Sequence, residues 1–501
     1  MVALEYATAR GRWVIAATVL GSGVAALDAT VVGIAVPAIG RDFALGVESL
    51  QWVVNGYTLS LAGLLLAGGA LGDRYGRRRM FLVGVVWFAV ASLLCGIAPN
   101  APVLIAARIL QGVGGALLTP GSLAILQASF APADRARAIG AWSGLGGVAT
   151  AAGPFLGGYL ISAVSWRWVF LINLPLALAV LAISARYVPE SRDPAGRGRL
   201  DFAGAALAAF GLAGLTYGLS AGLTNRPGRG WASPGVALPL LAGLALLGAF
   251  VVVELRSRSP MLPFAVFRSA QFRAANLVTF VVYGALGGAL FLVPVHLQQV
   301  AGYSPIGAGT ALLPITALML VFSGRSGALA ARIGPRLQMS AGPVVVAAGM
   351  ALLARIDRAG GYVNEVLPAV LLLGAGLAIT VAPLTSTALS AAPMEHAGVA
   401  SAVNNDVARA AALLAVAVLP PVAGLTGASY LHPAAFAHGF RIAVLIAAGA
   451  CAVGGLIAAA LIRNPSPAGG TAAEVVPAGR PPVHCALDGP PLATAREPGR
   501  G

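Results

Sequence analysis

Long apolar runs recur along almost the whole chain, and they decide what it can fold into. A helix needs roughly 20 apolar residues to cross a bilayer, where the backbone must satisfy its own hydrogen bonds. Fourteen runs of that length can be placed between residues 13 and 462. Only 10% of the 501 residues are charged, which is too few to cover a water-facing surface. We therefore predict an all-α polytopic membrane protein, with spans at 13–36, 52–71, 80–98, 103–127, 138–162, 168–186, 202–222, 236–255, 274–296, 308–330, 338–354, 366–389, 402–424 and 440–462.

The basic residues predict the orientation. All 32 are arginine, and cytoplasmic loops of membrane proteins carry an excess of positive charge. If the N-terminus is cytoplasmic, 22 arginines fall in cytoplasmic segments and 7 in external ones. We therefore expect both termini on the cytoplasmic side of the cell membrane, and we attribute the net charge of +15 to topology and not to nucleic-acid binding. The absence of lysine excludes a phosphate-binding loop and Schiff-base chemistry.

An internal repeat divides the chain. Residues 69–77, after the second span, and 327–336, after the tenth, share Gly, Leu, Arg and Gly at the same offsets. The predicted organisation is an N-terminus (1–12), a six-helix half (13–186), an inserted helix pair (202–255), a second six-helix half (274–462) and a disordered cytoplasmic tail (463–501). Two related halves are typical of transporters that alternate access around a central site.

Several motifs resemble those of the major facilitator superfamily. The signature loop is matched by Gly69, Leu71, Asp73, Arg74, Gly76, Arg77, Arg78 and Arg79. The other matching segments are Leu27-Asp28-Ala29-Thr30-Val31-Val32, Arg108-Ile109-Leu110-Gln111-Gly112, Gly153-Pro154-Phe155-Leu156-Gly157-Gly158, residues 166–175 and residues 302–305. Together they are typical of the fourteen-helix drug:proton antiporters. The resemblance implies a major facilitator fold with two inserted central helices, and export of amphiphilic drugs or antibiotics in exchange for protons.

The chain departs from that pattern at three places. Gly33 replaces the usual Asn of the first-helix motif, and Ala331 stands at the repeat position of Asp73. The tenth span lacks an acidic residue but contains Arg325. Some multidrug relatives use a second membrane acid there for doubly charged cations, so its absence argues against that substrate class.

Three residues in the spans are candidates for coupling. A carboxylate such as Asp28 costs roughly 2.5–3.5 kcal/mol at mid-membrane, so it is expected to face a cavity or a partner. There it can bind a cation or exchange a proton, although a satisfied structural Asp is the alternative. Arg108 is a fixed positive charge, and the resemblance implies a role in proton coupling with Gln111 one turn away. The alternative is an Arg that reaches the cytoplasmic surface.

The thirteenth span contains a second charged group. Asp406 and Arg409 are three residues apart, and Asn405 and Arg409 are four apart, so each pair shares a helix face. Opposite charges there can form a structural pair, or a pair that a proton breaks during coupling. The sequence leaves both interpretations open.

Glycine-rich segments suggest gating and close helix packing. In the loop after span two, the resemblance implies a gating latch formed by Gly69, Asp73, Arg74, Gly76, Arg77 and Arg78; an orientation signal is the alternative. In span five, Gly153, Pro154, Gly157 and Gly158 form the antiporter motif. Small residues four apart let helices approach and Pro bends a helix, so this motif is expected to pack and to seal.

Aromatic and polar residues suggest a cavity for a bulky apolar substrate. The candidates are Tyr57, Tyr217, Phe280, Tyr283, Phe291, His296 and Gln298. Aromatic faces attract cations, although most aromatics in membrane helices pack or anchor the interface. The five His and three Cys show no metal-ligand spacing, so we expect no metal and no cofactor.

The predicted function is therefore proton-coupled export, with the proton gradient as energy source. The expected partners are a small amphiphilic substrate, protons and the lipid bilayer, and we expect a monomer. Two other transport functions stay open, namely export of one dedicated metabolite and proton-coupled import. A membrane enzyme or sensor is disfavoured, because no nucleophile–base–orienter pattern or soluble catalytic domain is present.

Overall fold

The computed structural model describes residues 4–192, 201–224, 230–257, 262, 264–357, 361–391, 397–427, 429 and 432–464. It divides into two units, Met1–Arg463 and Asn464–Gly501; the predicted tail lies, from residue 465 onward, outside the described residues. Among the described residues, 14 helices are long and apolar enough to cross a membrane. The fourteen predicted spans are confirmed, since each overlaps one of these helices.

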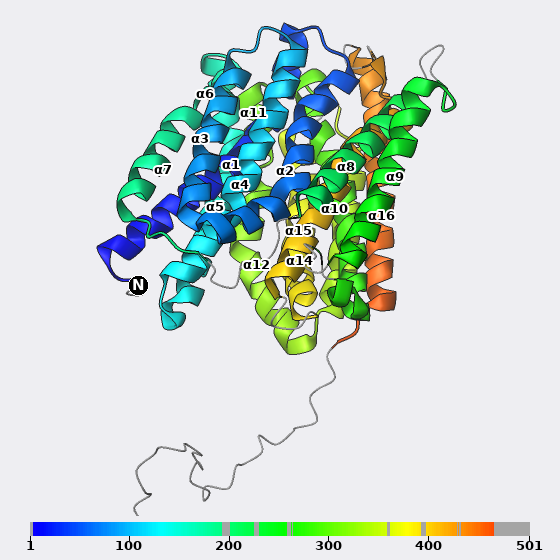
Figure 1. Cartoon of the computed structure of the whole chain (residues 1–501). Coiled ribbons are helices and arrows are strands. Elements are labelled where there is room, and N and C mark those ends of the chain that lie inside the picture. The colour runs from blue at the N-terminus through cyan, green and yellow to red at the C-terminus, as the bar shows by residue number, and fades with distance from the viewer. Residues whose placement is uncertain are drawn as a thin grey trace, which may run out of the picture. The chain divides into compact units, whose positions relative to one another are not determined.

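The helices follow one another through mostly short connections (Figure 1). Their bounds are α1 Ala9–Asp42, α2 Val47–Tyr75, α3 Arg77–Gly96, α4 Ala101–Ser129, α5 Pro132–Ala163, α6 Trp168–Leu171, α7 Asn173–Tyr187, α8 Phe202–Leu223, α9 Pro234–Arg256, α10 Ala270–Gln299, α11 Pro305–Ala311, α12 Leu313–Ile333, α13 Arg336–Leu353, α14 Leu367–Ser390, α15 Ala397–Val422 and α16 Pro433–Leu461. A 3-10 turn, Phe264–Arg268, precedes α10, and a π-helical turn, Tyr362–Val366, precedes α14.

Local sequence explains where several helices begin and end. The side chains of Thr8, Asn100 and Ser304 each accept a hydrogen bond of 3.1 Å from the backbone N–H three residues on, which caps α1, α4 and α11. Gly76 and Gly334 end α2 and α12 with φ of +115° and +86°, a region that favours glycine. These two glycines occupy the same position in the internal repeat, so both copies make the same kind of turn.

The helices pack as two halves with an inserted pair. In the first half, α4 packs against α2 and α3, and α1 against α5. In the second half, α10 packs against α15 and α16, and α14 against α12 and α13. Helices α8 and α9 pack on each other, and α8 contacts both α2 and α15 (Figure 1). The inserted pair therefore touches both halves where α2 meets α15.

The halves are joined at one end of the bundle. Consecutive spans alternate in direction, so α1 begins and α2 ends at one end, here called the N-side, and the other end is called the far side. On the far side, Gln51 donates to the carbonyl oxygen of Val416 at 2.6 Å, and Gln298 donates to that of Ile34 at 3.1 Å. A Cβ on Gly158 of α5 would lie 2.6 Å from a backbone atom of α11. These joins close the far side of the interface between the halves.

Candidate functional site

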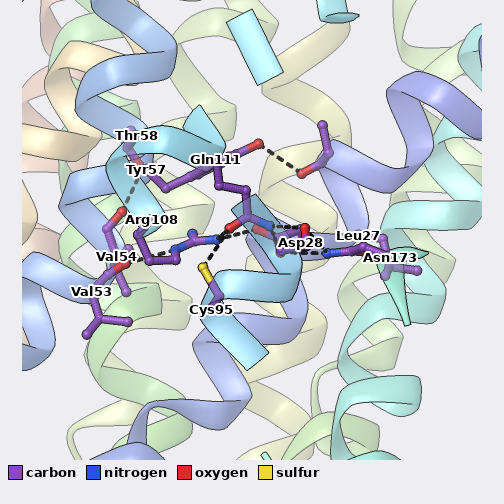
Figure 2. A network of polar contacts seen from close by, with 12 residues as sticks. Leu27, Asp28, Val53, Val54, Tyr57, Thr58, Cys95, Arg108, Gln111 and Asn173 are labelled. Carbon is purple, nitrogen blue, oxygen red and sulfur yellow. Dashed lines mark hydrogen bonds and ion pairs between the residues drawn. The ribbon is translucent and has the colours of Figure 1, made fainter. Parts of the chain in front are cut away.

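A fully buried ion pair lies inside the first half. Asp28 of α1 accepts from Arg108 of α4, with Oδ2 and Nη1 2.5 Å apart (Figure 2). Asp28 is 0% exposed and Arg108 is 1% exposed. Close packing makes the burial possible: a Cβ on Gly114 of α4 would lie 2.7 Å from the backbone nitrogen of Phe88 in α3. The structure thus brings together two residues that the sequence singled out separately.

Neutral polar side chains complete the coordination of the pair. Gln111 lies on the same face of α4 as Arg108; its Nε2 donates to Asp28 Oδ1 at 2.8 Å, and its Oε1 accepts from Arg108 at 2.5 Å. Asn173, the first residue of α7, donates to Asp28 Oδ1 at 3.1 Å. Ser92 of α3 accepts from Gln111 at 2.8 Å. The Asp28 carboxylate therefore accepts hydrogen bonds from Arg108, Gln111 and Asn173, and water does not reach it.

Ser92 and Asn173 were not predicted as site residues from the sequence. A single Ser in an apolar span gives no signal, because its hydroxyl can bond within its own helix. Asn173 lies in the segment 166–175 that resembles the subfamily, and this resemblance was the only indication. Cys95 of α3 also lies at this network, with its thiol 3.7 Å from Gln111 Oε1.

The guanidinium of Arg108 is held on its other sides by α2 and by aromatic rings. Its Nε donates to the carbonyl oxygen of Val53 at 3.0 Å. Its Cζ lies 4.3 Å from the centre of the Tyr57 ring and 5.7 Å from that of Phe170, within cation–π range. A buried ion pair is stable only when its remaining hydrogen-bonding groups are also satisfied, and this network provides those partners.

A cavity lies on the other side of Tyr57, between the two halves. It has a volume of about 270 Å³. Its walls come from α1, α2, α4 and α5 of the first half and from α15 of the second. The lining residues are Ser22, Ala25, Ala26, Ala29, Tyr57, Leu61, Thr119, Trp142, Gly146, Thr150 and Arg409. Tyr57, predicted as a cavity residue, therefore separates the buried ion pair from this cavity.

The group on α15 differs from its predicted arrangement. Among the described residues, no ion pair joins Asp406 to Arg409, although both are partly buried. Asp406 Oδ1 and Arg409 Nε are buried atoms without a hydrogen-bond partner. Asn405 is exposed and donates to the carbonyl oxygen of Ser401 in its own helix at 2.9 Å. Asp406 and Arg409 thus lie one turn apart on α15 without a contact between their charges.

The other predicted cavity residues do not line this cavity. Tyr217 of α8 is 38% exposed and lies near Trp52, with ring centres 6.1 Å apart, and Phe280 of α10 is 43% exposed. His296 is a core residue: it bonds the carbonyl oxygen of Ile356 at 2.9 Å and stacks on Phe440. The remaining three lie elsewhere in the second half: Tyr283 packs against the hydrophobic core, Phe291 is part of it, and Gln298 joins the halves on the far side.

The α2–α3 loop is bound to the end of α7. Asp73 pairs with Arg77 at 2.7 Å. The carboxylate of Glu190, just after α7, accepts from the backbone N–H groups of Arg78 and Arg79 at 3.1 Å each, where the dipole at the start of α3 favours a negative charge. Arg74 lies over the ring of Tyr75, and Gly69 packs beside Pro120 of α4. These contacts stay within the first half, so the predicted gating role stays a prediction.

The glycine motif of α5 allows two close helix contacts. A Cβ on Gly157 would lie 2.8 Å from Val31 of α1, and one on Gly153 would overlap Thr30 of the same helix. Gly158 faces α11, and the carbonyl of Pro154 faces Gly309 of that helix, where a Cβ would overlap it. The motif therefore packs α5 against α1 on one side and against the second half on the other.

The described residues include no cluster of three or more His, Cys, Asp or Glu side chains able to hold a metal ion. The arrangement can hold or release a proton at a carboxylate, and it can bind a ligand in the cavity next to it.

Comparison with known proteins identifies the family. The family model described as Major Facilitator Superfamily matches residues 18–417. A tetracenomycin C resistance and export protein of Streptomyces glaucescens is 37% identical over 412 residues, which cover 82% of this chain and 76% of that protein. A puromycin resistance protein of Streptomyces alboniger is 36% identical over 451 residues, with 87% and 88% covered. These relatives are named as resistance and export proteins, not as enzymes.

Solved structures show the same fold. A bacterial homolog of the human lysosomal transporter Spinster, in an inward-facing and unoccupied conformation, has a TM-score of 0.63 at 16% identity, covering 90% of this chain and 97% of that one. A transporter of the POT family in complex with a thioalcohol-conjugated peptide has a TM-score of 0.64 at 12% identity, covering 88% and 95%. The fourteen apolar helices, the two packed halves and the family match lead to one conclusion: the chain is a multi-pass membrane transporter that belongs to the major facilitator superfamily.

Proposed function

We propose that the chain exports amphiphilic antibiotics or drugs across the cytoplasmic membrane in exchange for protons, and that the Asp28–Arg108 pair carries the proton. The observation behind this proposal is the complete burial of that pair next to a cavity between the halves. A proton that reaches Asp28 removes its negative charge and leaves the Arg108 guanidinium without a counter-charge. Since an unpaired buried charge is costly, the protonated network favours a different arrangement.

The direction of export follows from the proposed orientation. The arginine distribution supports cytoplasmic termini, which makes the N-side cytoplasmic. The joins of Gln51, Gln298 and Gly158 then close the outer end, while the contacts described for the loop at Asp73 at the inner end lie within the first half. This arrangement corresponds to an inward-facing state, in which the cavity receives substrate from the cytoplasm. Export requires a second state with a different affinity for the ligand.

The relatives support antibiotics as the substrate class. The printed names of relatives at 35–37% identity include tetracenomycin C export, puromycin resistance and multidrug resistance. A transporter dedicated to one compound is the second candidate, because several of these names specify one antibiotic each. We propose further that the chain works as a monomer, with no cofactor and with the proton gradient as energy source.

Resistance and accumulation assays test the proposal. A bacterial strain without its own exporters would express the chain, Asp28→Asn, or the control Asp42→Asn at matched membrane levels. Asp42 lies in the same helix, but it is exposed and pairs with Arg167 at 2.9 Å. We expect the chain and Asp42→Asn to lower the accumulation of at least one antibiotic in a panel that includes tetracenomycin C and puromycin. An uncoupler should abolish this effect, and Asp28→Asn should lack it.

Two results would contradict the proposal. Full resistance with Asp28→Asn would remove that carboxylate from proton transfer. Export that persists in the presence of the uncoupler would exclude the proton gradient as the energy source.

A further inference from the structure

Among the residues that the structure describes, one charged side chain lines the cavity between the halves, and its charge is positive. Of the described lining residues, only Arg409 is ionised at neutral pH. Asp28 lies behind Tyr57 and is 0% exposed, and its oxygens are bonded to Arg108, Gln111 and Asn173. A ligand in this cavity therefore does not meet the carboxylate that sequence analysis offered as a receptor for cations.

The hydrogen atoms of the lining hydroxyl groups are largely committed to the helices. Tyr57 donates to the carbonyl oxygen of Ala25 at 3.3 Å, and Ser22 and Thr150 donate to carbonyl oxygens one turn earlier in their own helices. The indole N–H of Trp142 donates to Ser22 Oγ at 2.8 Å. The guanidinium of Arg409 is different: its buried Nε has no partner, and an Arg offers N–H donors only. Because Arg409 lines the cavity, its guanidinium brings a positive charge and N–H donors to the wall, and a complementary ligand offers an acceptor.

The remaining wall favours a flat apolar frame. Ala25, Ala26 and Ala29 form a smooth strip along α1, and the rings of Tyr57 and Trp142 stand beside it. At about 270 Å³, the cavity lies near the lower end of ligand pockets, which span roughly 300–1,000 Å³. The ligand, or the part of it that enters, is therefore small and rich in aromatic or aliphatic surface.

We infer that this cavity binds an amphiphile whose apolar, aromatic frame carries an acidic oxygen group, a carboxylate or a phenolate, and that Arg409 binds this group. The inference rests on the proposed function only in treating the cavity as a transport site. Guanidinium binds carboxylate through two parallel, charge-assisted hydrogen bonds. Asp406 weakens the positive field of Arg409 from the same helix, but it is not among the lining residues. Its removal should strengthen anion binding.

Equilibrium binding of matched probes tests this inference. The full chain in lipid nanodiscs, without a pH gradient, is titrated with anthracene-9-carboxylate, with its neutral amide, and with (anthracen-9-ylmethyl)trimethylammonium. We expect the carboxylate to bind at least about tenfold more tightly than the cation, as one charge-assisted contact predicts. Arg409→Gln should weaken carboxylate binding about tenfold or more and change amide binding little. Arg409→Lys should retain part of the affinity, and Asp406→Asn should raise it.

Arg325→Gln is the matched control. This Arg also lies in a membrane helix, α12, but it is exposed and donates to the carbonyl oxygen of Val321 in its own helix at 2.7 Å. It should leave all three affinities unchanged. Tighter binding of the cation, weakened by Asp406→Asn, would overturn the inference, as would equal binding of all three probes. Because no gradient is applied, these outcomes do not depend on whether transport is coupled to protons.

Discussion

Removing the two charges of the buried pair, singly and together, separates its contribution to stability from its role in transport. In Asp28→Asn, the guanidinium of Arg108 loses its counter-charge but keeps Val53 O and Gln111 Oε1 as acceptors. Breaking a buried pair on one side costs about 3–5 kcal/mol, and the retained acceptors favour the lower end. A loss of about 3 kcal/mol lowers the folding equilibrium constant about 150-fold.

The opposite single variant should lower the free energy of unfolding by a similar amount. In Arg108→Gln, the Asp28 carboxylate keeps the donors Gln111 and Asn173 but loses its guanidinium. The double variant Asp28→Asn, Arg108→Gln contains no buried charge at this place, and its amides can bond one another. Since replacing a whole buried pair is often close to neutral, we expect the double variant to lie within about 1.5 kcal/mol of the unchanged chain.

Stability and transport must be measured on the same preparations. Equilibrium unfolding in mixed micelles gives the three free-energy differences, and proteoliposomes with an imposed pH gradient give proton-driven export. We expect the double variant to recover stability and not transport, because it has no carboxylate to carry the proton. Additive losses in stability would refute the pairing described here. A stable double variant that still exports under the gradient would refute Asp28 as the proton carrier.

Two glycines give further predictions. Gly158→Ala places a methyl group about 2.6 Å from the backbone of α11, so it should open the far side and lower export. Gly140→Ala is the control, because a Cβ there has nothing within 4 Å and should do neither. Labelling of a cysteine introduced on the far side would measure the opening. Gly76→Ala forces a side chain onto a φ of +115° beside Glu190, 2.7 Å away, and should cost about 1–2 kcal/mol or more in unfolding measurements. Equal labelling and equal export by Gly158→Ala and Gly140→Ala would contradict the first prediction. An unchanged free energy of unfolding in Gly76→Ala would contradict the second.

The fold could be predicted because the membrane restricts it so strongly. Span length, the arginine distribution and one glycine repeat were sufficient to place fourteen helices and to identify α12 as the counterpart of α2 in the second half. The repeat also predicted backbone conformation, since Gly76 and Gly334 both adopt a positive φ at the end of their helices. The contact of α8 with both α2 and α15 was not predictable, because lipid and protein neighbours select for similar apolar residues.

The site was predictable in part, for a related reason. Charges at membrane depth are expensive, so Asp28 and Arg108 stood out in the sequence, and the structure explains them by pairing one with the other. Small polar residues are tolerated at membrane depth at a low free-energy cost, so Ser92 and Asn173 did not stand out in the sequence. Aromatic residues failed as markers of a cavity: Tyr57 lines it, whereas Phe280 faces outward, and residue type does not distinguish the two.

Asp28 lies close to the cavity that Arg409 lines, so a proton on Asp28 changes the affinity of that cavity for a charged ligand. The direction of this electrostatic change opposes exchange. At fixed geometry, a proton on Asp28 adds one positive charge behind Tyr57, which strengthens the binding of an acidic ligand next to Arg409. Exchange requires the opposite, because the protonated carrier must release the ligand. The change of shape that follows the loss of the ion pair must therefore outweigh the electrostatic effect.

Asp28→Asn imitates the protonated carboxyl, so ligand binding to this variant shows whether the change of shape outweighs the electrostatic effect. We expect it to bind anthracene-9-carboxylate about tenfold more weakly than the unchanged chain, with Asp42→Asn as control. Tighter binding would mean that proton and ligand assist each other, as in cotransport, and would contradict exchange. The membrane potential favours the outward movement of an anion by itself, because moving one negative charge out of an inside-negative cell gains about 2.3 kcal/mol per 100 mV. Cotransport of one proton with one such anion moves no net charge. A dependence of export on potential alone would therefore not demonstrate proton exchange, whereas the sign of the Asp28→Asn effect discriminates between the two mechanisms.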